Sequence, residues 1–136
     1  MAKTERRRSA DRLPKEIDVA LKAAEDKKAE NIVLLDLRKA AGFTDRFIIC
    51  SGNNPRQIRA IADAILEALA AAGSQPAHVE GYDRSEWVLL DYFDFVVHIF
   101  NPDTRAFYGL ERLWGSAQRL EVVDADPRPP DRAERD

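Results

Sequence analysis

The chain has 136 residues, of which 45 % are hydrophobic and 33 % are charged, and its formal net charge at pH 7 is −3. This length and this apolar share are typical of one globular domain with a substantial core, and they argue against two domains. The longest uninterrupted apolar runs span only a few residues, which excludes a membrane-spanning helix of the usual length.

The cellular compartment is indicated by two features of the sequence. The first residues, Met1 to Ser9, lack the apolar segment of a secretory signal. The single cysteine, Cys50, excludes an internal disulfide bond. Together they predict a cytoplasmic protein.

Both ends of the chain are polar and poor in apolar residues. Residues 1–15 carry six basic and two acidic side chains, whereas residues 121–136 carry three basic and six acidic ones. We therefore predict a disordered basic extension over residues 1–13 and a folded domain over residues 14–120. Residues 121–136, which are also rich in proline, are predicted to form a disordered acidic tail.

The first half of the domain shows a helical pattern followed by apolar strands. A helix is expected from Pro14 to Glu30, because Ile17, Leu21 and Ala24 fall on one stripe with charged residues elsewhere. The segments after it are predicted, in order, as the strand Asn31–Leu37, the loop Arg38–Asp45 and the strand Arg46–Ser51. Both strands are apolar on two faces, as central strands are.

A second, longer helix follows. Asn54 is expected to be its N-cap and Pro55 its first helical residue, where the missing N–H of proline has no consequence. Gly73 ends it. Its apolar stripe, which must cover one sheet face, consists of Ile58, Ile61, Ala62, Ile65, Leu66 and Leu69.

A hairpin then forms the centre of the predicted sheet. After a short strand near Pro76–Glu80 come the strands Trp87–Asp91 and Phe95–Phe100. The last of these is apolar on both faces except at His98, which predicts a central strand. The turn Tyr92-Phe93-Asp94 has none of the glycine or asparagine that tight hairpins prefer. Bulky aromatic residues in such a turn suggest a binding surface.

The last predicted element is a helix. Asn101 caps it, Pro102 is its first residue, and it continues to about Trp114, with Gly115 at its end. Its apolar side is expected to consist of Phe107, Leu110, Leu113 and Trp114. The resulting order, α-β-β-α-β-β-β-α, predicts an α/β fold with a mixed central sheet of about five strands flanked by helices.

Asp36, Asp91 and Asp94 lie at or just beyond strand ends, which raises the possibility of a two-metal phosphoryl-transfer site. Such a site needs carboxylates that converge on one face, whereas Asp91 and Asp94 are three apart with a turn between them. Ser51-Gly52 also lacks the glycine-rich, lysine-bearing loop that binds phosphates. We therefore predict no catalytic residue, no metal site and no cofactor.

The two histidines and the cysteine are given structural roles. A histidine such as His98 can act as a general base. In an apolar strand, however, a histidine is more often a core residue hydrogen-bonded to a carboxylate or carbonyl. His78 is expected on the surface. Cys50, without a ligand partner at metal-binding spacing, is expected to be a small core residue.

Several segments of the chain are recognisable together. They are Phe43–Asn53, Arg56–Asp63, Glu80-Gly81, Trp87–Tyr92, Asp94–Phe100 and Tyr108–Trp114. In sequence and spacing they resemble the ribosomal silencing factor (RsfS, iojap-like) family. The resemblance covers about residues 14–120 and leaves the two ends unexplained. Phe93 is a departure, since many members have glycine or another small residue there.

The resemblance implies a function. Members of this family bind the large ribosomal subunit through its protein fourteen, and they block docking of the small subunit when nutrients are scarce. It also implies a nucleotidyltransferase-like core without that enzyme's catalytic motif. The expected protein is therefore a repressor of translation and not an enzyme. In this setting the cluster Arg6-Arg7-Arg8 is either a solvated tail or a weak contact with ribosomal RNA phosphate.

The partner-binding residues are expected around the hairpin. They are Trp87, Tyr92, Phe93, Asp94, Glu80 and Asp83. The aromatic residues would supply desolvated contact area, and the acidic ones would pair with basic groups of the ribosomal protein. Trp87 has an alternative use, which is to cover the sheet edge against Tyr108 or Trp114.

Two other functions stay open from the sequence. One is a nucleotidyltransferase-like phosphoryl-transfer enzyme, which would bind Mg²⁺ and nucleotide. The other is a homodimeric adaptor that pairs through the exposed hairpin or a sheet edge. A homodimer of the free protein is also compatible with the first function, because one aromatic surface would serve both contacts.

Overall fold

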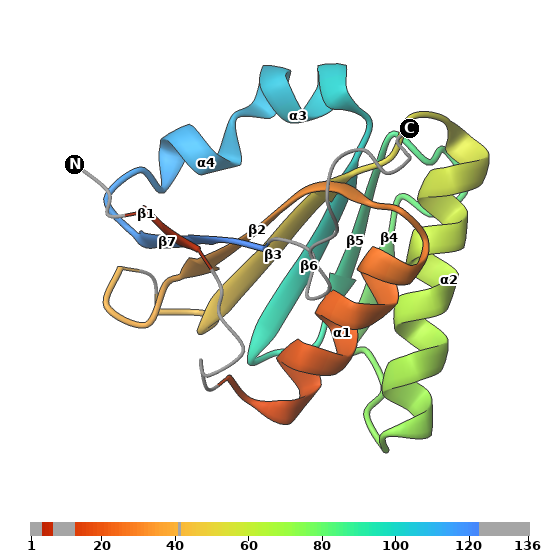
Figure 1. Ribbon diagram of the computed structural model, residues 1–136, viewed down its shortest axis with the longest axis horizontal. Helices are drawn as coiled ribbons and strands as arrows, with labels where there is room; N and C mark the ends of the chain where they lie inside the picture. The colour runs from red at the N-terminus through yellow and green to blue at the C-terminus, as the bar shows by residue number, and fades with distance from the viewer. Residues whose placement is uncertain (1–3, 7–12, 41, 123–136) are drawn as a thin grey trace, which may run out of the picture.

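The computed structural model describes residues 4–6, 13–40 and 42–122. Within these residues the chain forms a seven-stranded mixed sheet with helices on both faces (Figure 1). The strands are β1 (Thr4–Arg6), β2 (Glu30–Asp36), β3 (Arg46–Ser51), β4 (His78–Glu80), β5 (Trp87–Asp91), β6 (Phe95–Phe100) and β7 (Gln118–Glu121). The helices are α1 (Lys15–Asp26), α2 (Pro55–Ala71), α3 (Pro102–Tyr108) and α4 (Leu110–Leu113).

The strands follow the order β1-β7-β2-β3-β6-β5-β4 across the sheet. The pair β3–β6 is parallel, with Arg46 opposite Phe95 and Ser51 opposite Phe100, and the short pair β1–β7 is also parallel. The other neighbouring strands are antiparallel. All six residues of β6 are buried, as expected for a strand that is covered on two faces. The predicted mixed α/β fold is therefore confirmed.

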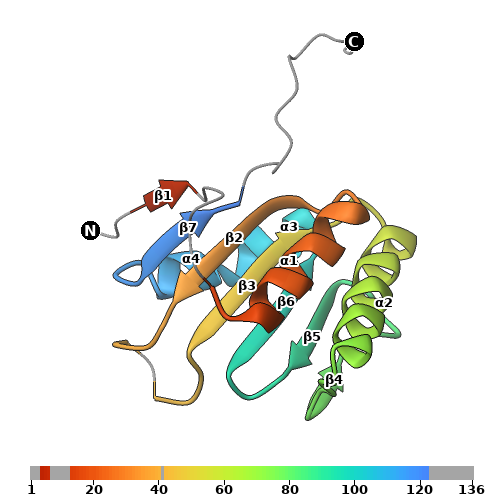
Figure 2. The same cartoon turned by 60° about the horizontal axis from the view of Figure 1, so that its bottom comes forward.

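The two faces of the sheet are covered very differently. Helices α1 and α2 lie side by side on one face, and α3 and α4 lie on the other (Figures 1 and 2). The larger apolar core lies under α1 and α2 and includes Ile17, Leu21, Ile61 and Ile65 packed on strand residues such as Val97. On the opposite face the smaller core reaches only Leu110 and Trp114 of the α4 region. The short helices cover this face less completely, and Trp87, Leu89, Leu110 and Trp114 are only partly buried there.

The predicted caps of the helices are present. The Asn54 side chain accepts a hydrogen bond from the Gln57 N–H at 2.8 Å at the start of α2. The Asn101 side chain accepts one from the Thr104 N–H at 2.8 Å at the start of α3. In both helices proline follows the cap, where it has no hydrogen bond to lose.

The last predicted helix is in fact two short helices. Gly109 has φ 59° and ψ 44°, a left-handed conformation that ends α3 and begins α4. The break changes the direction of the following turn. As a result, Phe107 and Leu113 are 78 % and 71 % exposed, although the helical pattern placed them on the side that packs against the sheet.

The ends of the domain differ from the prediction. β7 pairs antiparallel with β2 and was not expected, because only Leu120 among its residues is apolar. β1 pairs with β7 and falls within the segment 1–13 that was predicted to be disordered. Glu121, assigned to the acidic tail, is the last residue of β7. The sheet therefore has two more strands than the five expected, because pairing of the backbone does not require an apolar pattern at a sheet edge.

The boundary between α1 and β2 is also earlier than expected. α1 ends at Asp26, not at Glu30, and the chain reverses at Lys28, which has φ 64°. Glu30 already belongs to β2. Of the arginine cluster, Arg6 lies in β1, whereas Arg7 and Arg8 lie outside the described residues, as do residues 123–136. The predicted RNA contact and the disorder of those segments stay predictions. In the described part of the chain no helix is long and apolar enough to cross a membrane.

Candidate functional site

A connected set of aromatic rings lies on the sheet face opposite α1 and α2. We call it the aromatic face, and its members are Phe43, Phe47, Trp87, His98, Phe100, Phe107, Tyr108 and Trp114. Trp87 is central to it, with its ring centroid 4.9 Å from that of Phe100 and 4.7 Å from that of Tyr108. At the other end of the aromatic face, the ring centroid of Phe43 lies 6.1 Å from the ring centroids of both Phe47 and Trp114.

The aromatic face has a buried floor and an exposed rim. Phe47, His98 and Phe100 are buried, and Trp87 is half-buried. Phe43 is 61 % exposed, Tyr108 is 52 % exposed, and Phe107 is still more accessible. Exposed apolar side chains gathered in one place, and not scattered singly, are typical of a protein-interaction surface.

Trp87 is held in this surface by contacts on several sides. It begins β5 directly opposite Phe100, and its indole N–H donates a hydrogen bond to His98 Nδ1 at 3.0 Å. Its contact with Tyr108 is the one expected if Trp87 covers the sheet edge. Because the indole is nevertheless half-exposed, it both packs on the sheet and presents a ring surface to solvent.

His98 lies on the floor of the aromatic face and is 3 % exposed. Burial lowers its pKa to about 3, so the imidazole is neutral at physiological pH. It is a core residue, as expected, but its partner is the indole N–H of Trp87 and not a carboxylate or carbonyl. A neutral, hidden imidazole bonded in this way is poorly suited to act as a general base.

Tyr92 does not belong to the aromatic face. It is 7 % exposed and stacks on Phe95 in the core under α1 and α2, with ring centroids 5.0 Å apart. Side chains alternate between the faces of a strand, so residues five apart, such as Trp87 and Tyr92, point to opposite faces. Tyr92 was expected to supply contact area beside Trp87, and in this position it has little exposed surface to offer a partner.

Phe93 and Asp94 form the tip of the hairpin, at the far end of β5 from Trp87. Phe93 has φ 70°, and its N–H donates to Asp91 Oδ1 at 2.9 Å. The Thr44 hydroxyl donates to the Phe93 carbonyl at 2.7 Å, which fastens the tip to the loop before β3. The Phe93 ring is 72 % exposed and, with Phe43, lines a hollow of about 310 Å³. The hollow places Phe93 near Phe43, the outer ring of the aromatic face, although the rest of its lining is mostly polar.

Glu80 and Asp83 lie toward the other end of β5. Glu80 is the last residue of β4, opposite Leu89, and Asp83 is exposed in the loop that leads to Trp87. Between them, Gly81 has φ 77°, and a Cβ there would come within 2.0 Å of the Trp87 carbonyl oxygen. Only glycine allows this close approach, which brings the acidic loop against the start of β5. The six predicted residues are thus divided among two ends of the hairpin and the core.

Residues 10–136 match the model of the family described as "Ribosomal silencing factor during starvation". The chain belongs to the ribosomal silencing factor family. It is similar to the ribosomal silencing factor RsfS of Halalkalibacterium halodurans, with 41 % identity over 106 residues, which are 78 % of this chain and 91 % of that protein. With RsfS of Bacillus subtilis the identity is 43 % over 101 residues, which are 74 % and 86 % of the two chains.

A solved structure shows the same fold. The X-ray structure of a protein from Chromobacterium violaceum matches with a TM-score of 0.74 and 34 % identity, and it covers 85 % of this chain and 96 % of that chain. The resemblance found from the sequence is therefore confirmed, both in family and in fold.

An ion-pair cluster fixes α3 and α4 to the sheet in this silencing-factor fold. Arg105 donates from Nε and Nη2 to the two carboxylate oxygens of Glu111, at 2.8 and 3.0 Å, and from Nη1 to the Ser51 hydroxyl at 2.9 Å. Arg119 of β7 lies 3.1 Å from the same carboxylate. Burial by itself would raise the pKa of Glu111, but the bonds and charges of the two arginines outweigh it and lower the pKa. We call Arg105, Glu111, Arg119 and Ser51 the arginine clamp.

Two of the three carboxylates considered for metal binding, Asp36 and Asp91, have other partners. The Nε and Nη2 atoms of Arg38 donate hydrogen bonds to the Asp36 carboxylate, the shortest at 2.6 Å. These bonds lower the pKa of Asp36 despite its partial burial. The Asp91 carboxylate accepts a hydrogen bond from the Phe93 N–H. Across the residues that the structure describes, no group of three histidine, cysteine or acidic side chains is placed to hold a metal ion.

Cys50 is fully buried, and burial raises the pKa of its thiol to about 12. A thiol that is neither accessible nor ionised is unreactive, so its role is that of the small core residue that the sequence predicted.

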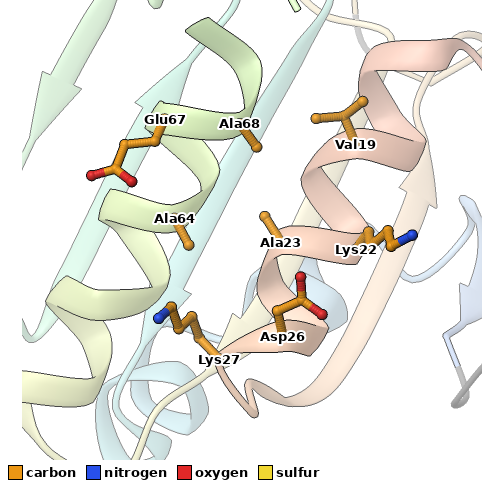
Figure 3. Close-up of a pocket in the computed structure, with 8 residues that line it drawn as sticks. All are labelled: Val19, Lys22, Ala23, Asp26, Lys27, Ala64, Glu67 and Ala68. Atoms are coloured by element: carbon orange, nitrogen blue, oxygen red, sulfur yellow. The ribbon is translucent and has the colours of Figure 1, made fainter. Parts of the chain in front are cut away.

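A groove between α1 and α2 lies on the opposite side of the molecule from the aromatic face. Figure 3 shows its floor of small side chains, with Ala23 of α1 facing Ala64 and Ala68 of α2. Its volume is about 540 Å³, and charged residues of both signs, such as Lys27 and Glu67, stand along its edges. The alanines let the two helices approach closely, and the polar groups do not converge on one point.

The sequence did not identify the outer part of the aromatic face. Phe43 lies in a predicted loop, and Tyr108 and Phe107 lie in a predicted helix, where apolar residues are usually attributed to packing. A usable signal was present at Gly109, since a glycine within an apolar helical pattern can end the helix. With a helix break placed at Gly109, the sequence would have predicted that Phe107 and Leu113 are exposed.

Proposed function

We propose that this protein binds the large ribosomal subunit through its protein fourteen and prevents association with the small subunit, repressing translation under nutrient limitation. The observation that supports this best is the aromatic face around Trp87, with exposed rings on an otherwise well-packed domain. The family resemblance supplies the identity of the partner, and the chain contributes a surface suited to it. We also propose that the protein acts in the cytoplasm.

Trp87 and Tyr108 form the centre of the proposed contact. Half-buried aromatic rings that are already packed lose little side-chain entropy on binding, and tryptophan and tyrosine are enriched among residues that dominate interface energies. Phe93, at the hairpin tip, extends the contact area toward Phe43. Tyr92, being in the core, has no part in it.

The acidic residues supply orientation. Glu80 and Asp83 lie at one end of β5 and Asp94 at the other, and all three are exposed. Ribosomal proteins are usually basic, so carboxylates at both ends of an apolar strip would attract the partner and fix its direction. Because these groups are solvated, we assign them mainly to the association rate, and the aromatic rings to the affinity.

The proposed mechanism requires no chemical step. A rigid domain occupies the surface of the large subunit, and its bulk fills space that the small subunit needs. The tight pairing of Asp36 with Arg38 and the neutral state of His98 are in keeping with a protein that excludes a partner and does not catalyse a reaction. The degree of repression is then set by occupancy alone.

The central test is the substitution Trp87→Ala. We expect it to weaken binding to purified large subunits by about 2 kcal/mol, or roughly 30-fold, because it removes the anchor of the contact. Affinity is measured by titration, and thermal unfolding is followed in parallel because the indole also packs on Phe100. Glu67→Ala, on the α2 surface away from the aromatic face, is the control and should bind normally.

Function is tested by mixing purified subunits with the protein and separating them on a gradient. Wild-type protein should keep the subunits apart, and Trp87→Ala should do so only at higher concentration. Full yields of joined ribosomes in the presence of saturating wild-type protein would refute the proposal. Light scattering with and without protein fourteen shows whether free copies pair through the same surface and separate on binding.

A further inference from the structure

We propose that His98 is a positioning residue for the aromatic face, because its Nδ1 atom fixes the orientation in which the indole of Trp87 meets a partner. The orientation itself is a property of this chain. Its effect on affinity rests on the proposed binding to protein fourteen.

His98 occupies a position where a polar side chain is unexpected. It stands in the middle of β6, opposite Ile49 of β3 and Leu89 of β5, and its neighbours along the strand are apolar. Its ring lies 4.4 Å from that of Phe47 in an edge-on arrangement. Its Nε2 atom is buried and has no hydrogen-bond partner among the described residues. An apolar residue would suit these surroundings better, so the fold alone gives no reason for histidine.

The hydrogen bond with Trp87 gives such a reason. An indole N–H is only a donor, so His98 Nδ1, 3.0 Å away, must be the acceptor and must carry no proton. This requires the neutral tautomer with its proton on Nε2. Burial among aromatic rings keeps the imidazole neutral, so the acceptor is available at neutral pH.

The hydrogen bond restricts the rotation of the indole, which packing alone does not fix. Trp87 lies against Phe100 on one side and Tyr108 on another, and these contacts are apolar and tolerate sliding and rotation. A hydrogen bond prefers a narrow range of angles and so selects one rotamer of the indole. The orientation of Trp87 in turn supports Tyr108, whose exposed ring is the next part of the aromatic face.

This arrangement defines the kind of partner surface that fits. Tryptophan at an interface usually needs an acceptor for its N–H, from the partner or from water. Here the acceptor is internal, so the accessible part of the Trp87 ring is wholly apolar. The matching surface is therefore an apolar patch of a protein without a hydrogen-bond acceptor at its centre, bordered by the basic groups that Glu80 and Asp83 attract.

Two variants separate positioning from packing, of which leucine is close to histidine in volume and asparagine is smaller. His98→Asn keeps an acceptor oxygen close to the position of Nδ1, whereas His98→Leu removes it and leaves an apolar side chain. We expect His98→Leu to weaken binding to recombinant protein fourteen about tenfold, and His98→Asn to weaken it no more than about threefold. The thermal midpoint of His98→Leu should stay the same or rise, because it also removes the buried, unpaired Nε2–H.

The orientation is read directly by NMR, independently of any partner. The chain has two tryptophans, so two indole N–H signals are expected, and Trp114→Phe assigns them. The Trp87 signal should be protected from solvent exchange in the wild type and in His98→Asn, and should exchange rapidly in His98→Leu. The ¹⁵N shifts of His98 should show a proton on Nε2 and none on Nδ1.

A double-substitution cycle completes the test. In a Trp87→Ala background, His98→Leu should no longer change the affinity, because His98 acts only through the indole. Equal binding by His98→Leu and His98→Asn, or an unaltered Trp87 signal in His98→Leu, would overturn the proposal. If wild-type protein did not bind protein fourteen at all, the proposed function would fail, and the NMR comparison would still decide whether His98 orients Trp87.

Discussion

The hairpin tip offers a sharp test of backbone conformation, because Phe93 occupies a conformation that favours glycine. With φ 70° it lies in the left-handed region, which costs an L-residue roughly 1–2 kcal/mol. Glycine avoids this strain but loses about 0.5–1 kcal/mol more conformational entropy on folding than alanine does. The difference predicts that Phe93→Gly is more stable than Phe93→Ala by about 1 kcal/mol. At an ordinary position the order is reversed.

Comparing glycine with alanine, and not with the wild type, removes the contribution of the ring. The Phe93 side chain is 72 % exposed, so both variants lose the same small amount of apolar burial. The hydrogen bonds of the tip, from the Phe93 N–H to Asp91 and from Thr44 to the Phe93 carbonyl, involve the backbone and remain possible in both. Only the conformational preference at this residue then differs between them.

Urea unfolding at neutral pH measures the difference, and thermal unfolding should show a higher midpoint for glycine by about 4 °C. A matched control is the same pair of substitutions at Glu67, an exposed position inside α2, where glycine should be less stable than alanine by about 1 kcal/mol. If Phe93→Ala proved as stable as Phe93→Gly, or more so, residue 93 would not be strained and the reasoning would be refuted.

Two further predictions concern buried polar groups. Glu111→Gln should destabilise the protein by about 2 kcal/mol at pH 7, because it removes charge-assisted bonds with Arg105. The pKa of Glu111 is lowered by folding, so this stabilisation is complete above the unfolded-state pKa of about 4.3 and is lost as pH falls through the folded value. The two proteins should therefore become more alike in urea unfolding as the pH falls below the unfolded-state pKa. Tyr92→Phe should leave stability unchanged or raise it by up to about 1 kcal/mol, since the Tyr92 hydroxyl is buried and has no hydrogen-bond partner among the described residues. A clear loss of stability in chemical denaturation would show that this hydroxyl is bonded after all.

The central part of the fold was predictable because its signals are local and strong. The boundaries of β3, β5 and β6 and the cap of α2 follow from short apolar runs and from the pair Asn54-Pro55. Strand β7 was not predictable in the same way. Its residues are mostly polar, and it becomes a strand only because β2 offers an unpaired edge next to it. Such pairing depends on tertiary structure and has little trace in the local sequence.

The candidate site was predicted in part. Trp87 was selected because of its residue type and its family context, and the structure places it at the centre of an exposed aromatic cluster. Tyr92 was selected by proximity in sequence, although counting along the strand already assigns it to the other face. Tyr108 was expected only as a packing partner of Trp87 and not as part of the site, because its exposed fraction depends on where the last helix breaks.

The arginine clamp has a consequence for how tightly a partner is held. Through Arg105 it ties α3 both to α4 and to Ser51 of the sheet, so the platform that carries Tyr108 is already assembled before any encounter. A surface that is already ordered before binding loses little conformational entropy when the complex forms. Damage to the clamp should therefore leave the encounter rate nearly unchanged and shorten the lifetime of the complex, even though none of its side chains belongs to the aromatic face.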